Sequence, residues 1–134
     1  MARVFITGSS DGLGLMAARL LIEQGHEVVL HGRNDARRVD ALRAASKAKG
    51  AVSGDLSTIA GARSVAEQVN KLGRFDAVIH NAGVGYREPQ RIETERGAPN
   101  VFAVNVLAPY ILTALIERPA RPHRIVGVDL LAQR

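Results

Sequence analysis

The amino-acid sequence predicts a doubly wound α/β fold, in which helices cover both faces of a parallel sheet. Short apolar runs of strand type alternate along the chain with runs of helical periodicity. The connections between these runs are short, which favours βαβ units with right-handed crossovers. We therefore expect about five strands, in the order 3-2-1-4-5.

The first half of the chain supplies two strands and two helices. A strand-type run at residues 3–7 is followed at once by a helical pattern over 12–24, and Gly25 stands where a helix C-cap belongs. The second strand is expected over residues 27–30. A charged helix over residues 36–48 follows it and ends before a glycine.

A second βαβ unit is expected from a weak strand, a capped helix and a short apolar strand. Residues 51–54 form the weak third strand. Ser57 or Thr58 can cap the helix that runs to residue 72. Residues 77–80 form the fourth strand.

The last third of the chain is expected to hold a loop, an apolar helix and the fifth strand. Residues 85–97 are polar, basic and loop-like. The helix expected over residues 98–117 contains Pro109, which should kink or interrupt it. Residues 124–128 form the fifth strand, inside a divergent tail at residues 119–134.

Length and composition indicate a single domain over residues 1–134, with 46% hydrophobic and 23% charged residues. No apolar run approaches the roughly 20 residues of a membrane span, and the N-terminus leaves no room for a secretory signal. We therefore expect a cytoplasmic protein without a membrane partner. There is no cysteine for thiol chemistry, and the four histidines lack metal-ligand spacing, so no metal is expected.

The formal net charge of +5 raises the question of nucleic-acid binding. The basic residues are scattered, without a Lys/Arg tract and without interleaved aromatic side chains that could stack on bases. Solvated helix faces, with some attraction for an anionic ligand, explain this charge better. We expect no nucleic-acid partner.

The segment at residues 4–14 carries the most specific signal. Its strand stops at Gly8, Gly12 and Gly14 follow, and a helix starts at once. Glycines let a backbone approach an anion closely, and a helix N-terminus offers unpaired N–H groups and a favourable dipole. The segment therefore predicts a phosphate site. The alternative is a tight βα turn that needs glycine only for its geometry.

Polar residues also follow the other predicted strands. Arg33 follows the second, Asp55 the third, and residues 81–83 the fourth. Ligands of open α/β sheets bind beyond the carboxyl ends of the strands, at the point where the strand order reverses. Four loops that converge on one edge indicate a ligand site more strongly than the glycines alone.

These motifs resemble those of the short-chain dehydrogenase/reductase family. The pattern T-G-x-x-x-G-x-G at residues 7–14 is similar to the family's dinucleotide turn. H-N-A-G at residues 80–83 is similar to its N-N-A-G segment, with histidine in place of the first asparagine. Asp55-Leu56 matches the acidic residue after the third strand, and Asn105 matches the helix asparagine of the catalytic tetrad. The resemblance runs to about residue 128 and implies a Rossmann-type NAD(P)-binding domain.

The resemblance also implies which residues contact the cofactor. The expected cofactor-binding residues are Thr7, Gly8, Ser9, Ser10, Gly12, Leu13, Gly14, Arg33, Asn34, Asp55, Leu56, Asn81, Ala82 and Gly83. Asp55 is expected to contact the adenine ring, and Asn81 and Gly83 to keep the backbone open beside a ribose. Asn105 is the expected tetrad-like residue, which in the family holds a water. Either asparagine could instead serve only to tie neighbouring backbone together.

Arg33 determines which cofactor is expected. An acidic side chain at this position would bind the adenosine ribose and repel a 2′-phosphate, whereas the Arg33 guanidinium offers several donors to a phosphate. NADP(H) is therefore expected in preference to NAD(H). Asp11 departs from NADP-preferring relatives, which often carry a basic residue just before the second glycine.

The family's catalytic serine and Tyr-x-x-x-Lys are not found in these 134 residues. Leu130 stands about where the serine is expected, and neither Tyr86 nor Tyr110 has a lysine four positions later. In the family the tyrosine is the general acid/base. Three hypotheses follow: an oxidoreductase by ancestry with its chemistry lost or supplied elsewhere, a non-catalytic NADP(H)-binding or sensor module, and a truncated or frame-shifted gene product.

The fifth strand is also expected to affect assembly. Without a sixth strand beside it, this strand would be an exposed edge that invites pairing with another chain. We expect a homodimer through this edge or through the apolar helix at residues 98–117. A monomer in sedimentation at micromolar concentration would contradict that expectation.

Overall fold

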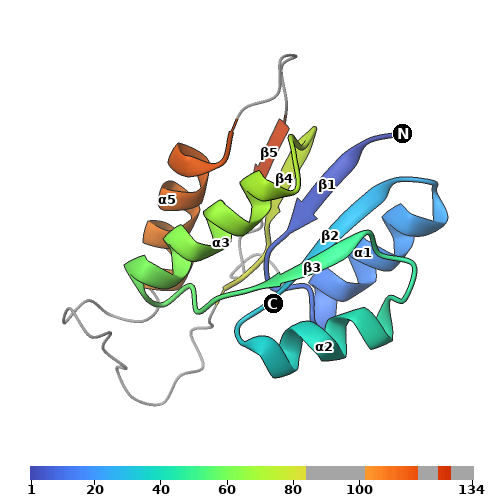
Figure 1. Cartoon of the computed structure of the whole chain (residues 1–134), viewed down its shortest axis with the longest axis horizontal. Helices are drawn as coiled ribbons and strands as arrows, with labels where there is room; N and C mark the ends of the chain where they lie inside the picture. Colours follow the sequence, from blue (N-terminus) through green and yellow to red (C-terminus); the bar gives the residue numbers. More distant parts are fainter. Residues whose placement is uncertain (84–101, 118–123, 128–134) are drawn as a thin grey trace.

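The computed structural model describes residues 1–83, 102–117 and 124–127. Its elements, in chain order, are β1 (Arg3–Ile6), α1 (Gly12–Glu23), β2 (Glu27–Gly32), α2 (Asp35–Ala44), β3 (Gly50–Ser53), α3 (Ile59–Lys71), β4 (Ala77–His80), η1 (Ala103–Leu107), α5 (Ala108–Leu115) and β5 (Arg124–Gly127). All neighbouring strands are parallel, in the order β3-β2-β1-β4-β5 (Figure 1). The predicted fold class is confirmed.

Helices cover both faces of the sheet. In Figure 1, α1 and α2 lie on one face, and α3 and α5 lie on the other. The central strand β1 shows why both faces need cover. Val4 and Ile6 pack in one core cluster with side chains of α1 and α2, and Phe5 packs in a second cluster with side chains of α3 and α5. Because successive strand side chains point to opposite faces, consecutive apolar residues require two cores.

Two helices begin at residues whose side chains cap them. Thr58 Oγ1 accepts a hydrogen bond from the Gly61 N–H at 2.9 Å, so Thr58 rather than Ser57 caps α3. Asn34 Oδ1 accepts the Arg37 N–H at 2.9 Å and caps α2 in the same way. These caps fix the exits from β2 and β3, where the candidate site lies.

The ends of the helices agree only partly with the sequence prediction. Gly25 follows α1 with a φ of 88°, as its predicted place at a C-cap requires. The helix α2 ends at Ala44, short of the predicted residue 48, because Ala45 leaves the helical conformation and buries its side chain in the core. Pro109 lies in the first turn of α5, directly after the π-helical segment η1, so the type of helix changes beside the proline while Leu107 and Ala108 keep helical dihedrals. The predicted effect of Pro109 is seen as this change of helix type and not as a break. The loop predicted at residues 85–97 lies outside the described residues.

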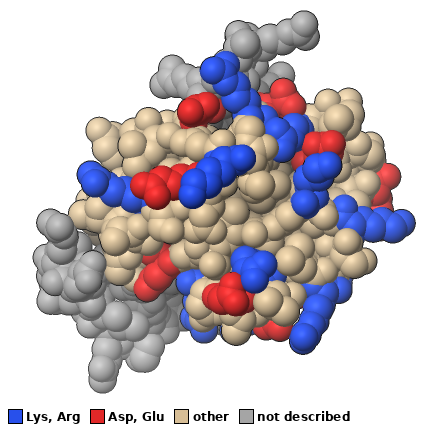
Figure 2. All heavy atoms as spheres, in the orientation of Figure 1, with Lys and Arg blue, Asp and Glu red and all other residues tan. Residues whose placement is uncertain are grey.

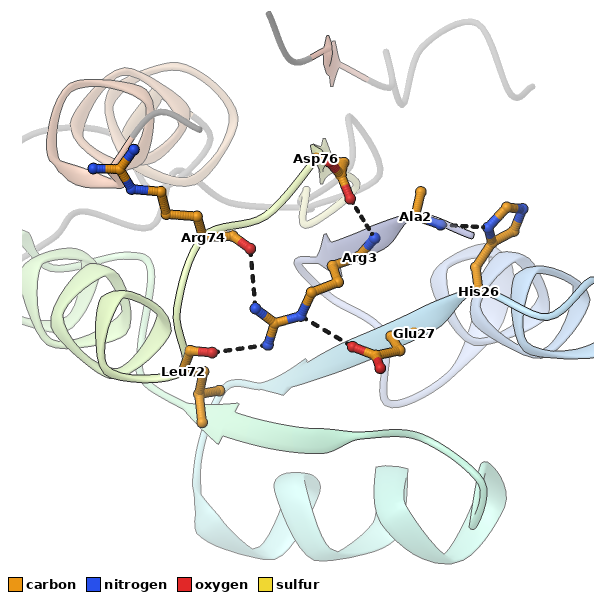
Figure 3. A network of polar contacts seen from close by, with 7 residues as sticks. All are labelled: Ala2, Arg3, His26, Glu27, Leu72, Arg74 and Asp76. Atoms are coloured by element: carbon orange, nitrogen blue, oxygen red, sulfur yellow. Dashed lines mark hydrogen bonds and ion pairs between the residues drawn. The ribbon is translucent and has the colours of Figure 1, made fainter. Parts of the chain in front are cut away.

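A polar network joins the amino ends of the strands (Figure 3). The Arg3 guanidinium donates from Nε to Glu27 Oε2 at 3.0 Å, from Nη1 to the Arg74 carbonyl at 3.0 Å and from Nη2 to the Leu72 carbonyl at 2.8 Å. The Arg3 N–H donates to Asp76 Oδ2 at 2.8 Å. One residue of β1 therefore ties together β2, the end of α3 and the start of β4.

Two further contacts stabilise the amino ends of the strands. The Arg3 guanidinium lies 4.8 Å from the centroid of the buried Phe75 ring, a cation–π arrangement. The Ala2 N–H donates to His26 Nδ1 at 3.0 Å (Figure 3). These contacts stabilise the amino ends of the strands, which lie opposite to the loops that carry the predicted site residues.

Charges of both signs are interspersed on the face drawn in Figure 2, where Lys and Arg side chains lie beside Asp and Glu. On α2, an ion pair joins Arg38 Nε and Asp35 Oδ1 at 2.7 Å. Among the residues that the structure describes, no helix has the length and hydropathy needed to cross a lipid bilayer.

Candidate dinucleotide-binding site

A pocket of about 820 Å³ opens at the carboxyl ends of the strands. The described residues that line it are Gly8, Ser10, Asp11, Gly12, Leu13, His31, Arg33, Asn34, Arg37, Asp55, Leu56, Ser57, Asn81, Ala82, Gly83 and Val104. They come from the end of β2, the loops after β1, β2, β3 and β4, the first residues of α1, and α2 and η1. The four loops that the sequence predicts to converge therefore do share one pocket.

The glycine turn after β1 depends on glycine at three positions for different reasons. Gly8 and Gly12 have φ values of 62° and 56°, in the left-handed region that favours glycine. A Cβ on Gly8 would also lie 2.8 Å from Ala82 Cα. A Cβ on Gly14 would meet the Gly8 carbonyl oxygen and would lie 2.6 Å from Asn81 Nδ2. Gly12 has no described atom within 4 Å of such a Cβ, so its side faces open space at the pocket.

The first helix presents its N-terminus to this pocket. Asp11 is the N-cap of α1, but its side chain makes no capping hydrogen bond, and the first turn contains no acidic residue. The N–H groups of a helix's first turn have no intrahelical partners and carry partial positive charge. This turn can therefore receive an anion.

Thr7 and Asn81 fasten the glycine turn to the loop after β4. The buried Thr7 Oγ1 accepts hydrogen bonds from the N–H groups of Asn81 at 3.1 Å and Ala82 at 3.0 Å. In return, Asn81 Nδ2 donates to the Gly8 carbonyl at 3.1 Å. The two residues hold the turn in position beside the pocket.

Ser9 is turned inward, away from the pocket lining. Its side chain is fully buried, and its Oγ donates to the Ile6 carbonyl at 2.8 Å and accepts from the His31 N–H at 2.8 Å. Thr7, Ser9 and Gly14, which the sequence predicts as cofactor-binding residues, are not among the described residues that line the pocket. Their hydrogen bonds and close packing shape the turn.

The adenine side of the predicted site carries several charges. Arg33 is exposed and lines the pocket beside Asn34. One turn into α2, Arg37 Nη1 lies 3.7 Å from Asp11 Oδ2 in an exposed ion pair. Asp55 Oδ1 accepts hydrogen bonds from the Ser57 N–H at 2.9 Å and the Ser57 hydroxyl at 2.7 Å, which fixes the carboxylate at the pocket rim.

Two buried histidines lie at the same edge of the sheet. Burial lowers the pKa of His31 below its ordinary value, although its hydrogen bond to the Gly54 carbonyl and the nearby charge of Asp55 partly oppose that shift. Burial also lowers the pKa of His80. The Nε2 atom of His80 lies 3.2 Å from Thr113 Oγ1, and within the described part of the chain its buried Nδ1 has no hydrogen-bond partner.

Asn105 lies in η1, next to the pocket-lining Val104, and is partly buried. Five further residues line the pocket although the sequence did not predict them as site residues: Asp11, His31, Arg37, Ser57 and Val104. The signal for His31 was an imidazole at the end of an apolar strand. The partners of the His31 ring, Gly8 and Gly54, follow other strands, so local sequence does not show what this imidazole contacts.

Among the described residues, no group of three His, Asp or Glu side chains is placed to hold a metal ion.

The sheet order and the glycine turn define a Rossmann-type α/β domain. Within that class, the chain belongs to the short-chain dehydrogenase family, whose model matches residues 2–124. An uncharacterised oxidoreductase of Emericella nidulans is 54% identical over 121 residues, which are 89% of this chain and 47% of that protein. The short-chain dehydrogenase chyC of Penicillium rubens is 47% identical over 90% of this chain and 46% of its own length.

Solved structures of the family agree with the fold. The Pseudomonas aeruginosa RhlG/NADP complex has a TM-score of 0.78 at 26% identity, covering 98% of this chain and 55% of that one. A metagenomic short-chain oxidoreductase in complex with NADP has a TM-score of 0.76 at 29% identity, covering 96% of this chain and 62% of that one. The chain thus spans about half the length of the curated relatives it matches.

Proposed function

We propose that this chain binds NADP(H) in the pocket at the carboxyl edge of its sheet. The observation that carries the proposal is the convergence of the glycine turn and three further strand-end loops on one pocket. In a doubly wound fold this is where a dinucleotide is held. Two related structures, 26% and 29% identical to this chain, are described as NADP complexes.

The pyrophosphate would lie against the glycine turn and the start of α1. Gly12 has no described atom where a side chain would stand, and the first turn of α1, which contains no acidic residue and is not capped by the Asp11 side chain, offers its N–H groups. A dinucleotide extended from this point would reach Asp55 and Leu56 with its adenine. In the other direction, its nicotinamide ribose would reach residues 81–83.

The 2′-phosphate of NADP(H) would be bound by Arg33, with Asn34 beside it. Arg33 is exposed on the pocket rim and carries no acidic neighbour in sequence until Asp35. A planar guanidinium presents several donors to a phosphate and stays charged at neutral pH. This arrangement favours NADP(H) over NAD(H).

Replacing Arg33 with aspartate tests the cofactor assignment. The Arg33→Asp variant is expected to bind NADPH about 10- to 100-fold more weakly, because it loses charge-assisted hydrogen bonds and repels the 2′-phosphate. Its affinity for NADH should stay unchanged or improve. Titration of both cofactors by fluorescence or calorimetry measures the ratio.

Arg63→Asp is the matched control for this variant, since Arg63 is exposed on α3 and outside the pocket lining, and the change in net charge is the same. An unchanged ratio of NADPH to NADH affinity in Arg33→Asp would contradict the assignment. So would an equal loss of NADPH affinity in Arg63→Asp, because only long-range charge would then be at work.

We further propose that this chain binds the cofactor without turnover. In the family that the chain resembles, a tyrosine delivers the proton during hydride transfer, with a lysine four residues later. Here Tyr86 and Tyr110 are followed at that distance by Gln90 and Ala114. The isolated chain should therefore be stabilised by NADPH in thermal unfolding, yet should show no steady NADPH oxidation with a panel of aldehydes and ketones. Sustained oxidation above the protein-free rate would refute the proposal.

A further inference from the structure

His31 stands at the carboxyl end of β2 with 2% of its surface exposed, and it lines the pocket. Both of its ring nitrogens contact backbone. Nδ1 lies 2.9 Å from the Gly8 N, and Nε2 lies 2.9 Å from the Gly54 carbonyl oxygen. A carbonyl oxygen can only accept, so the proton must be on Nε2. Nδ1 is then the acceptor for the Gly8 N–H.

The main chain of His31 holds the next residue of the same turn. The His31 N–H donates to Ser9 Oγ at 2.8 Å, and the His31 carbonyl accepts the Ser9 N–H at 3.1 Å. Two consecutive residues of the glycine turn are therefore bound by one residue of β2. The Gly54 contact joins this group to the end of β3, so the imidazole connects three strand ends.

We propose that the neutral Nε2–H form of His31 is a positioning device, which holds Gly8 in the conformation that the dinucleotide pyrophosphate requires. The inference rests on the proposed cofactor site and adds to it a means by which pH controls the turn. Gly8 has a φ of 62°, and its N–H points to the imidazole, not to another backbone carbonyl. The turn thus depends on a side chain that can change its protonation state.

Protonation of His31 would place an Nδ1–H against the Gly8 N–H, so that two donors face each other where one hydrogen bond had been. The charged groups around the same pocket are Asp11 and Arg37 as a pair, Arg33 on the rim, and Asp55 beyond β3. Asp55 attracts a proton to His31, but burial outweighs it and lowers the pKa of His31. The neutral form therefore prevails at neutral pH.

The direction of the pH effect follows from that lowered pKa. In the unfolded chain His31 takes up its proton near its ordinary pKa of 6.5, whereas the folded protein resists uptake until a lower pH. The stability that neutral His31 contributes is therefore complete above pH 6.5. It is lost progressively as the pH falls from 6.5 toward the lower pKa of the folded state, and cofactor affinity should fall as the folded protein takes up the proton.

Two substitutions of His31 separate the contacts of its two nitrogens. In His31→Asn, the amide oxygen takes a place near that of Nδ1 and can accept the Gly8 N–H, and in His31→Gln the amide nitrogen can reach Gly54 but leaves Gly8 without an acceptor. His31→Asn is expected to bind NADP⁺ within about threefold of the wild type at pH 7.5, and His31→Gln about tenfold or more weakly. Between pH 7.5 and 5.5, wild-type affinity should decline more steeply than that of His31→Asn, because ionisation of the NADP⁺ phosphate is common to both.

His26→Asn is the matched control. His26 also accepts a backbone N–H on Nδ1, from Ala2, but it does so at the opposite edge of the sheet (Figure 3). This variant should bind NADP⁺ with the affinity and pH profile of the wild type. A change as large as that in His31→Gln would overturn the inference, because the effect would then be a general loss of stability.

The Gly8 amide proton supplies a readout that needs no cofactor. Its exchange in the free protein should stay protected in His31→Asn and lose protection in His31→Gln, and ¹⁵N spectra of the wild-type ring should show the proton on Nε2. Equal Gly8 protection in the two variants, or a proton on Nδ1, would overturn the inference. If the wild type bound no NADP⁺ while this exchange pattern held, the cofactor proposal would fail and the positioning of the turn by His31 would stand.

Discussion

Replacing Gly14 with alanine is expected to weaken NADPH binding by more than about tenfold and to lower the free energy of unfolding by about 2 kcal/mol. The new Cβ would meet the Gly8 carbonyl oxygen and would lie 2.6 Å from Asn81 Nδ2. These two atoms form the hydrogen bond that fastens the glycine turn to the loop after β4. The neighbours are backbone and a hydrogen-bonded amide, so neither yields without breaking that link. Cofactor titration and denaturant unfolding measure the two effects.

Gly50→Ala is the control for this change. Gly50 begins β3, and a Cβ there would have no described atom within 4 Å. The free energy of unfolding of the Gly50→Ala variant should change by less than about 1 kcal/mol, and its NADPH affinity should equal that of the wild type. Gly14→Ala protein that unfolded at the same denaturant concentration as Gly50→Ala and bound NADPH normally would contradict the close packing at Gly14.

Replacing Arg3 with methionine is expected to lower the free energy of unfolding by about 2 kcal/mol without changing NADPH affinity. Methionine keeps much of the aliphatic length but removes three hydrogen bonds, to Glu27 and to the carbonyls of Leu72 and Arg74. It also leaves the partly buried Glu27 carboxylate without its cation. The network lies at the amino ends of the strands (Figure 3), whereas the pocket lies at their carboxyl ends. Denaturant unfolding and cofactor titration separate the two properties.

Arg74→Met serves as the comparison for Arg3→Met. The Arg74 side chain is 57% exposed and lies 3.9 Å from Glu117, a surface ion pair of the kind that contributes about 0–1 kcal/mol. Its Arg3 contact uses the main-chain carbonyl, which the substitution keeps. Equal unfolding midpoints for the two variants would show that the Arg3 network adds no more than a surface pair. A loss of NADPH affinity in Arg3→Met would show that the two edges are coupled.

The sheet and its order could be predicted because the signals are local and repeat. Consecutive apolar residues such as Val4, Phe5 and Ile6 require cover on both faces, as in a parallel sheet between two helix layers. The cap at Thr58 and the change from π-helix to α-helix beside Pro109 follow from the chemistry of single residues. The positions of the four strand-end loops then follow from topology alone.

What the sequence could not predict depends on contacts between residues far apart in the chain. His31 is hydrogen-bonded to Gly8, from which it is 23 residues distant in sequence. Arg3 is hydrogen-bonded to the carbonyls of Leu72 and Arg74, which are 69 and 71 residues away. Ser9 turns inward because the His31 main chain lies behind it. The alanine-rich stretch after residue 44 favours helix by propensity, yet Ala45 ends the helix when its side chain enters the core.

The place of β1 in the sheet also determines the order in which the chain can assemble during synthesis. β1 pairs with β2 through Arg3 to Phe5, but its other edge pairs with residues 77–79 of β4. When the first βαβ unit leaves the ribosome, one edge of its first strand is therefore still open. That edge can pair with β4 only after the segment that follows α3 has been translated, because contacts of high sequence separation form late. The hydrogen bonds of Arg3 to Leu72, Arg74 and Asp76 also form late, because these three partners are translated just before β4.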